Sequence, residues 1–206
     1  MAEEWNDEGI DYAIQGNYAE AVRCFDEAIR LDPDDASPWN NKGLAYDDQG
    51  NHAEAIRCFD EAIWLDPDDA YAWYNKGNAC NNQGNYAEAI RCFDEAIWLD
   101  PDFAMAWNNK GFAHADQGNY AEAIRCFDEA IRLDPNLAMA WNNKGNVYNS
   151  QGNYTEAIRC YDEAIRLDPD DASPWNNKGI AYYNQGNHAE AIRCYDEAMM
   201  LDPGLA

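Results

Sequence analysis

The sequence predicts an all-α protein, built as a solenoid of stacked antiparallel helix pairs. Two observations predict it: prolines and tryptophans each recur with a period of 34 residues, at Pro33, Pro67, Pro101, Pro135, Pro169 and Pro203 and at Trp5, Trp39, Trp73, Trp107, Trp141 and Trp175. A fixed period of this length is the signature of a repeat architecture. We therefore interpret residues 1–206 as a single array of six repeats, 2–35, 36–69, 70–103, 104–137, 138–171 and 172–205.

The first half of each repeat is predicted to be a helix with one packed face. In the second repeat, Trp39, Gly43 and Tyr46 follow i, i+4, i+7 spacing and share that face. Gly50 stands where the end of a helix favours a residue with a left-handed backbone. The first helix should therefore end at this glycine.

The second half of each repeat is predicted to be another helix. Asn51 is expected to cap it, with Glu54 completing a capping box. Its inner face combines two small residues with one aromatic residue, namely Ala55, Ala62 and Phe59. Pro67 follows, where it cannot continue a helix. One helix pair has too little core to be stable alone, so neighbouring repeats must stack.

These residues resemble the tetratricopeptide repeat, whose pattern is W-x2-L-G-x2-Y, then A-x3-F, then P. The third repeat supplies Trp73, Gly77, Ala89, Phe93 and Pro101, with Cys80 in place of the tyrosine. The leucine of the pattern is replaced by Glu8, Lys42, Lys76, Lys110, Lys144 and Lys178. A lysine stem can pack there while its ammonium reaches water. The resemblance implies a right-handed superhelix whose first helices line a concave groove.

The charge balance narrows the class of partner. The chain has 39 acidic and 14 basic residues, a net charge of −25. Such a surface repels phosphate backbones and anionic membranes, so we expect neither nucleic acid nor a membrane as a partner. The start, MAEEWNDEG, lacks the features of a signal peptide. No apolar stretch approaches the roughly 20 residues needed to cross a bilayer, and we expect a cytoplasmic location.

A ladder of asparagines is the main candidate site. At about 100° of rotation per residue, Asn41 lies opposite Trp39, and stacking aligns equivalent residues along the groove: Asn41, Asn75, Asn109, Asn143 and Asn177. An amide offers a donor and an acceptor, so it can pair with the backbone of any extended peptide. The array is similar to the tetratricopeptide region of O-linked N-acetylglucosamine transferase, where a matching asparagine holds substrate backbone. Asp7 interrupts the ladder in the first repeat. In the alternative, these amides are solvated or bridge adjacent repeats.

Apolar residues in repeats three to five are predicted to lie on or beside the same face: Tyr71, Tyr74, Met105, Phe112 and Met139, with Phe103 and Leu137 near the repeat junctions. Exposed apolar clusters mark interaction sites, although Phe103 and Leu137 could instead cover the stack. The basic residues occupy three repeat positions, none of them on this face. A clamp for acidic C-termini needs cations and is disfavoured. We expect a protein partner that presents an extended peptide segment with apolar anchors and neutral or basic flanks.

No motif indicates catalysis, a cofactor or a metal site. Six cysteines recur in one column and read as free, packed thiols, since helices about 8–10 Å apart are too distant for a disulfide. The three histidines stand in place of aromatic residues. The DPDD turns suit helix capping better than calcium binding. Trp64 and Trp98 occupy an outward position that carries arginine in other repeats.

Head-to-tail self-assembly is the rival function. Solenoids normally carry polar caps on their terminal repeats. The chain stops at LDPGLA with no solvating helix, so the last helix is expected to expose the face that a further repeat would cover, with Ile192, Tyr195, Met199 and Leu201. Such a contact need not close into a ring. A designed or consensus-like array would have the same end.

Overall fold

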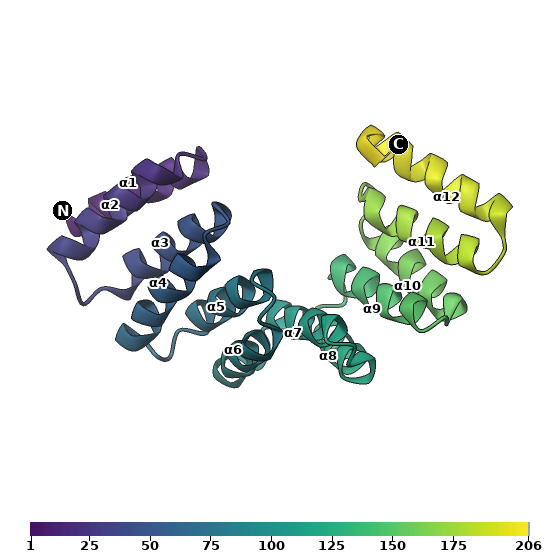
Figure 1. Ribbon diagram of the computed structural model, residues 1–206, viewed down its shortest axis with the longest axis horizontal. Coiled ribbons are helices and arrows are strands. Elements are labelled where there is room, and N and C mark those ends of the chain that lie inside the picture. Colours follow the sequence, from purple (N-terminus) through teal and green to yellow (C-terminus); the bar gives the residue numbers. More distant parts are fainter. Residues whose placement is uncertain (206) are drawn as a thin grey trace. The chain divides into compact units, whose positions relative to one another are not determined.

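The computed structural model describes residues 1–205, so Ala206, the last residue of the predicted array, lies outside the described residues. These residues form twelve α-helices, a final 3-10 turn (Pro203–Leu205) and no strand (Figure 1). The all-α fold class is confirmed. None of the described helices is both long and apolar enough to cross a membrane. The helices are α1 (Ala2–Ile14), α2 (Tyr18–Leu31), α3 (Ala36–Asp48), α4 (His52–Leu65), α5 (Ala70–Asn82), α6 (Tyr86–Leu99), α7 (Ala104–Asp116), α8 (Tyr120–Leu133), α9 (Ala138–Ser150), α10 (Tyr154–Leu167), α11 (Ala172–Asn184) and α12 (His188–Leu201).

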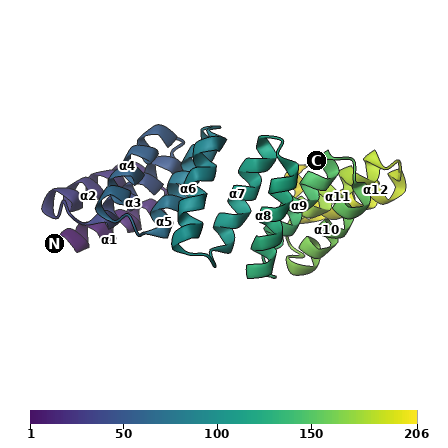
Figure 2. The same cartoon turned by 90° about the horizontal axis from the view of Figure 1, so that it is seen from below.

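The helices belong to two compact units, Met1–Asp102 and Phe103–Ala206. Each unit holds three helix pairs, and the two helices of a pair run antiparallel and side by side (Figures 1 and 2). First helices of neighbouring repeats also touch, α1 with α3 and α3 with α5 in one unit, α7 with α9 and α9 with α11 in the other. Each unit is therefore a stack of helix pairs. The single continuous array of six repeats stays a prediction.

The turn inside each pair depends on a glycine. Gly50 has a φ of 77°, and its N–H donates to the carbonyl oxygen of Asp47 at 2.8 Å. The N–H of Asn51 donates to the carbonyl oxygen of Tyr46, also at 2.8 Å. These two bonds are those of a Schellman motif, which needs a left-handed residue at the glycine position. The predicted end of the first helix is confirmed.

The predicted capping box is wrong. The Asn51 side chain makes no capping hydrogen bond, and the N–H of Glu54 donates to the backbone oxygen of Asn51 at 3.1 Å. Asn51 takes part in the Schellman turn through its backbone, at φ −86° and ψ 57°, whereas the equivalent Asn187 also accepts from the N–H of Glu190 at 3.5 Å. Aspartates of the DPDD turns do cap first helices: the Asp35 carboxylate accepts from the N–H of Ser37 at 2.9 Å. Asp69 and Asp171 do the same for α5 and α11.

The core repeats from one helix pair to the next. Phe59 is fully buried and packs with Ala55 of its own helix and Ala79 of the next repeat. A Cβ added to Gly43 would lie 2.5 Å from Cε1 of the Phe59 ring, closer than atoms can approach. The glycine is therefore needed because an aromatic ring occupies the space beside it. This close contact fixes how the two helices of a pair face one another.

Candidate functional site

The first helices present an open, pocketed face within each unit. In the second unit a pocket of about 390 Å³ lies where α7, α8 and α9 meet, lined by Phe112, Ala115, Asp116, Tyr120, Phe127, Asn143, Asn146, Val147 and Ser150. In the first unit a pocket of about 240 Å³ lies between α1 and α3 and is lined by residues at matching repeat positions, among them Ile10, Asn41 and Leu44. The face predicted to line the groove is thus accessible to a ligand in both units.

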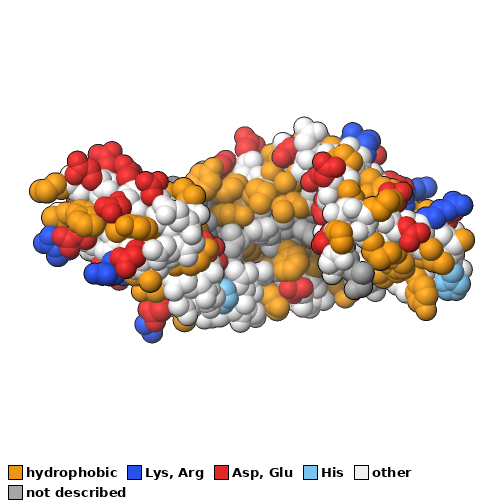
Figure 3. Space-filling model, turned by 90° about the horizontal axis from the view of Figure 1, so that it is seen from above, with side chains coloured by type: hydrophobic (Ala, Val, Ile, Leu, Met, Phe, Trp, Pro, Cys, Tyr) orange, Lys and Arg blue, Asp and Glu red, His pale blue; other side chains and the backbone are white. Residues whose placement is uncertain are grey.

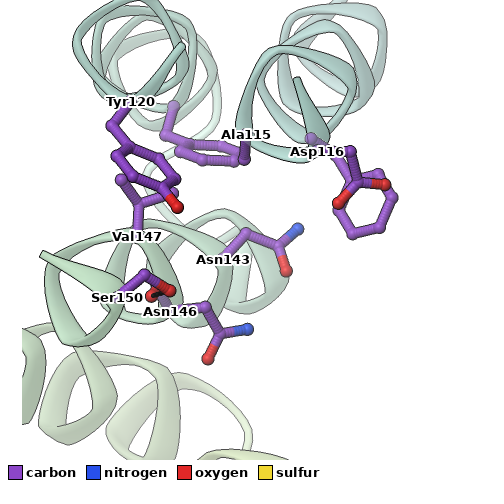
Figure 4. A pocket seen from close by; sticks show the side chains of 9 residues that line it. Ala115, Asp116, Tyr120, Asn143, Asn146, Val147 and Ser150 are labelled. Atoms are coloured by element: carbon purple, nitrogen blue, oxygen red, sulfur yellow. Dashed lines mark hydrogen bonds between the residues drawn. The ribbon is translucent and has the colours of Figure 1, made fainter. Parts of the chain in front are cut away.

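The larger pocket combines apolar and polar walls. Figure 4 shows Tyr120 and Val147 together on one side and Asp116 on the other, with Asn143 between them. Asn143, Asn146 and Ser150 project from α9 and supply donors and acceptors. Asp116 is the one charged residue among those that line it. Such a pocket suits an apolar side chain whose neighbouring backbone is polar and whose flanks are neutral or basic.

The predicted ladder residues are half-buried, and four of them bridge adjacent repeats. Asn41 Nδ2 donates to Asn6 Oδ1 at 3.0 Å. The same bond joins Asn75 to Asn40 at 3.1 Å, Asn143 to Asn108 at 3.2 Å and Asn177 to Asn142 at 3.0 Å. In each case the ladder asparagine, two residues after its tryptophan, donates to the asparagine that directly follows the tryptophan of the preceding repeat. At these four positions the amides therefore bridge adjacent repeats, as in the alternative stated for the ladder.

Bridging leaves part of each amide for other partners. A carboxamide has two N–H groups and an acceptor oxygen, and the bridge uses one N–H. Sequence reasoning did not single out the partner asparagines, although Asn40, Asn108 and Asn142 directly precede ladder residues in WNN segments and Asn6 follows Trp5. Asn108 is 2 % exposed, and its own amide donates to Asn109 Oδ1 at 2.9 Å. The ladder is thus anchored from behind by a second row of amides.

The predicted apolar residues divide between the two units. Tyr71 and Tyr74 lie on α5 in the first unit, where Tyr71 is 62 % exposed and the Tyr74 ring is tilted by 50° against the Phe93 ring, with centroids 6.0 Å apart. Met105, Phe112 and Met139 lie on α7 and α9 in the second unit, and Met139 and Phe112 are exposed. Each unit therefore carries its own apolar group. Trp64 and Trp98 are both largely exposed, which confirms the outward positions predicted for them.

The lysines behave differently from the expectation that their ammonium reaches water. The Lys144 side chain is only 14 % exposed, and its Nζ lies 2.6 Å from Asp128 Oδ1 of the preceding repeat. The ammonium also lies over the Trp141 ring, 5.5 Å from its centroid, and 5.9 Å from that of Tyr148. Burial opposes this charge, but the hydrogen bond and the charge of Asp128 outweigh it and raise the pKa of Lys144. Equivalent pairs join Lys42 to Asp26, Lys76 to Asp60 and Lys178 to Asp162.

The cysteines are free and buried at all seven positions. Burial raises the pKa of the Cys58 and Cys160 thiols to about 11, so both are protonated at neutral pH. No group of three His, Cys, Asp or Glu side chains placed to hold a metal is found within residues 1–205. The thiol column acts as packing between the helices.

Repeat pattern, helix pairs and junctions together define a helical repeat protein. Family models described as tetratricopeptide repeat match residues 36–69, 70–103, 104–137, 172–205 and 126–159, and one described as TPR repeat matches 9–50 and 145–186. The chain belongs to the tetratricopeptide repeat family.

Solved structures support the same fold. PilW, a type IV pilus biogenesis factor, is 20 % identical, with a TM-score of 0.88 over 100 % of this chain and 94 % of its own. MamA is 25 % identical, with a TM-score of 0.69 over 79 % of this chain and 95 % of its own. YrrB, described as a TPR protein with an unusual peptide-binding site, is 24 % identical, with a TM-score of 0.64 over 87 % of this chain and 92 % of its own. Among curated proteins, none matches the sequence significantly.

Proposed function

We infer that this chain is a protein-interaction scaffold, an inference that its tetratricopeptide repeats support. We propose that it binds an extended peptide segment, neutral or basic, across the pocketed faces of its first helices, without catalysis or a cofactor. The observation that carries the proposal is the pocket at Phe112 and Asn143, where an exposed apolar side chain, a ladder amide and a carboxylate share one opening. An apolar side chain of the peptide fills the pocket, and the amide pairs with its backbone.

Charge supports the preference for neutral or basic segments. Acidic and hydrophobic side chains occur side by side on the surface drawn in Figure 3. The net charge of −25 attracts cationic segments and repels acidic ones. Binding should therefore weaken as the salt concentration rises, because salt screens exposed charges.

The test separates peptide binding from stacking. Asn143→Ala breaks the bridge to Asn108, and Asn142→Ala breaks the equivalent bridge to Asn177, so each variant loses one junction bond. Each should lower the free energy of unfolding by about 1 kcal/mol. Asn143→Ala should also weaken a peptide, selected from an array of basic, neutral and acidic segments, by about five-fold. Asn142→Ala should leave its affinity unchanged. Calorimetry that gives equal affinities for both variants and wild type would rule out a role for the ladder.

Self-assembly is a second candidate, favoured by the apolar face of α12, where Ile192 is 60 % exposed and Met199 36 % exposed. Repulsion between two carboxylates opposes self-assembly. In other repeats a lysine of the following repeat meets the aspartate that corresponds to Asp196, whereas the first repeat carries Glu8 at that position. Two copies stacked head to tail would bring two carboxylates together. We expect light scattering to give a constant monomer mass over a wide concentration range, and a mass that grows with concentration would favour assembly.

A further inference from the structure

The first repeat contains a pocket without a lysine, whereas the matching pockets of other repeats are lined by a lysine of the same repeat. It has a volume of about 500 Å³ and is lined by Trp5, Glu8, Tyr12, Glu20, Arg23, Cys24, Asp26, Glu27 and Arg30. Matching pockets occur in the second repeat, lined by Trp39, Lys42 and Tyr46 among others, and in the fifth. The first-repeat pocket thus has the same two aromatic walls, but a carboxylate replaces the ammonium.

The other repeats show where a cation rests in this pocket. Five lysine ammonium groups lie 5.1–5.6 Å from the centroid of the tryptophan three residues earlier. Three of them also lie 5.9 Å from the centroid of a tyrosine four residues later. These distances fit cation–π attraction, which acts within about 6 Å of a ring centroid. The tryptophan position therefore contacts a cation in all five repeats that supply a lysine, and the tyrosine position does so in three of them.

Of the four carboxylates that line this pocket, all except Glu8 are paired with a cation. Glu20 pairs with Arg23 at 3.2 Å, Asp26 pairs with Lys42 at 2.5 Å, and Glu27 accepts from Arg30 Nε at 2.9 Å. No cation of residues 1–205 pairs with Glu8 or lies over the Trp5 ring, which is 37 % exposed. Burial, followed by the charges of Glu8 and Glu20, raises the pKa of the Cys24 thiol, and the charge of Arg23 acts against this rise. At the corresponding Cys58 the charge of Lys42 acts in the opposite direction.

We propose that Trp5, Glu8 and Tyr12 form a binding site for a lysine side chain of a partner protein. A glutamate carboxylate reaches as far as the Cε of a lysine at the same position. An ammonium hydrogen-bonded to it lies about one ångström beyond the place of the internal Nζ. An ammonium paired with Glu8 would therefore approach the Trp5 ring, as the internal ammonium groups approach the tryptophans of their own repeats. The site is on the tryptophan face of α1, opposite the ladder face, so it is independent of the proposed groove.

The experiment titrates the whole chain with a blocked lysine, Nα-acetyl-lysine methylamide, against its neutral norleucine analogue. Nuclear magnetic resonance follows the indole N–H of each tryptophan. The lysine compound should shift the Trp5 signal saturably, at millimolar concentrations, and the norleucine compound should not. Trp39 is the internal control, because the Lys42 ammonium already lies over its ring.

Two variants complete the test. Glu8→Gln should weaken binding about five-fold, since it removes the charge and keeps the shape. Glu8→Lys should abolish the shift of the Trp5 signal, because the ammonium of the new lysine would lie over the Trp5 ring as the lysines of other repeats lie over their tryptophans. The Glu8→Lys variant is titrated at a concentration where light scattering gives the monomer mass, and circular dichroism confirms that it is folded. A Trp5 shift that is equal for both compounds, or that survives Glu8→Lys, would overturn the proposal.

Discussion

Replacing Phe59 with alanine is expected to lower the free energy of unfolding by about 3–5 kcal/mol. The ring is fully buried and contacts Gly43 of its own repeat and Ala79 of the next, so its loss opens a cavity at a helix pair and at a junction together. Gly43→Ala alone should cost about 1–3 kcal/mol, because the new Cβ would lie 2.5 Å from the ring. Chemical denaturation followed by circular dichroism measures both.

The double variant is the control for this pair. Without the ring, alanine at position 43 has room, and alanine favours a helix over glycine by about 1 kcal/mol. Gly43→Ala should therefore be harmless or stabilising when Phe59→Ala is present. If the two losses simply add, the close contact is not the reason for the glycine.

Replacing Asp128 with asparagine is expected to destabilise the α8–α9 junction by about 1–2 kcal/mol, a range that allows for the screening of an exposed partner. The variant leaves the mostly buried Lys144 ammonium without its counter-charge, although the Asp128 side chain is 55 % exposed. The matched control is Glu129→Gln, which breaks the exposed pair of Glu129 with Arg132 on the same helix. This control should change stability by less than about 0.5 kcal/mol. If both variants lose the same free energy of unfolding, the pair of Lys144 with Asp128 stabilises the protein no more than an exposed ion pair does.

The same junction predicts a dependence on high pH. The pKa of Lys144 is raised in the folded state, so its contribution is complete below the ordinary lysine pKa of about 10.4 and is lost as pH rises through the folded value. The stability difference between wild type and Asp128→Asn should therefore be constant near neutrality and shrink in strongly alkaline solution. Urea denaturation of both proteins at several pH values measures it.

Backbone signals were readable in the sequence because they act locally. Gly50 ends its helix through its own left-handed conformation, and Phe59 is buried because its helix has one apolar face. The partners of polar side chains were not readable, since they depend on how closely one repeat approaches the next. Whether Asn143 meets water, a peptide or Asn108 is decided by that spacing.

A signal for the junctions was nevertheless present within the chain. The lysine of each later repeat follows a repeat that carries an aspartate sixteen positions earlier, as in Lys144 and Asp128. The first repeat carries Glu8 instead. Pairwise reading of adjacent repeats would have predicted the ion pairs and the row of paired amides.

The likeness of the junctions has a consequence for how the chain can change length. Asn108 and Asp128 on one side receive Asn143 and Lys144 on the other, and Asn177 and Lys178 carry the same groups one repeat later. Excision of residues 138–171 would therefore join surfaces that already match. The new junction would have the same amide bridge and the same ion pair, so the number of repeats in this unit can change by one without new interface chemistry.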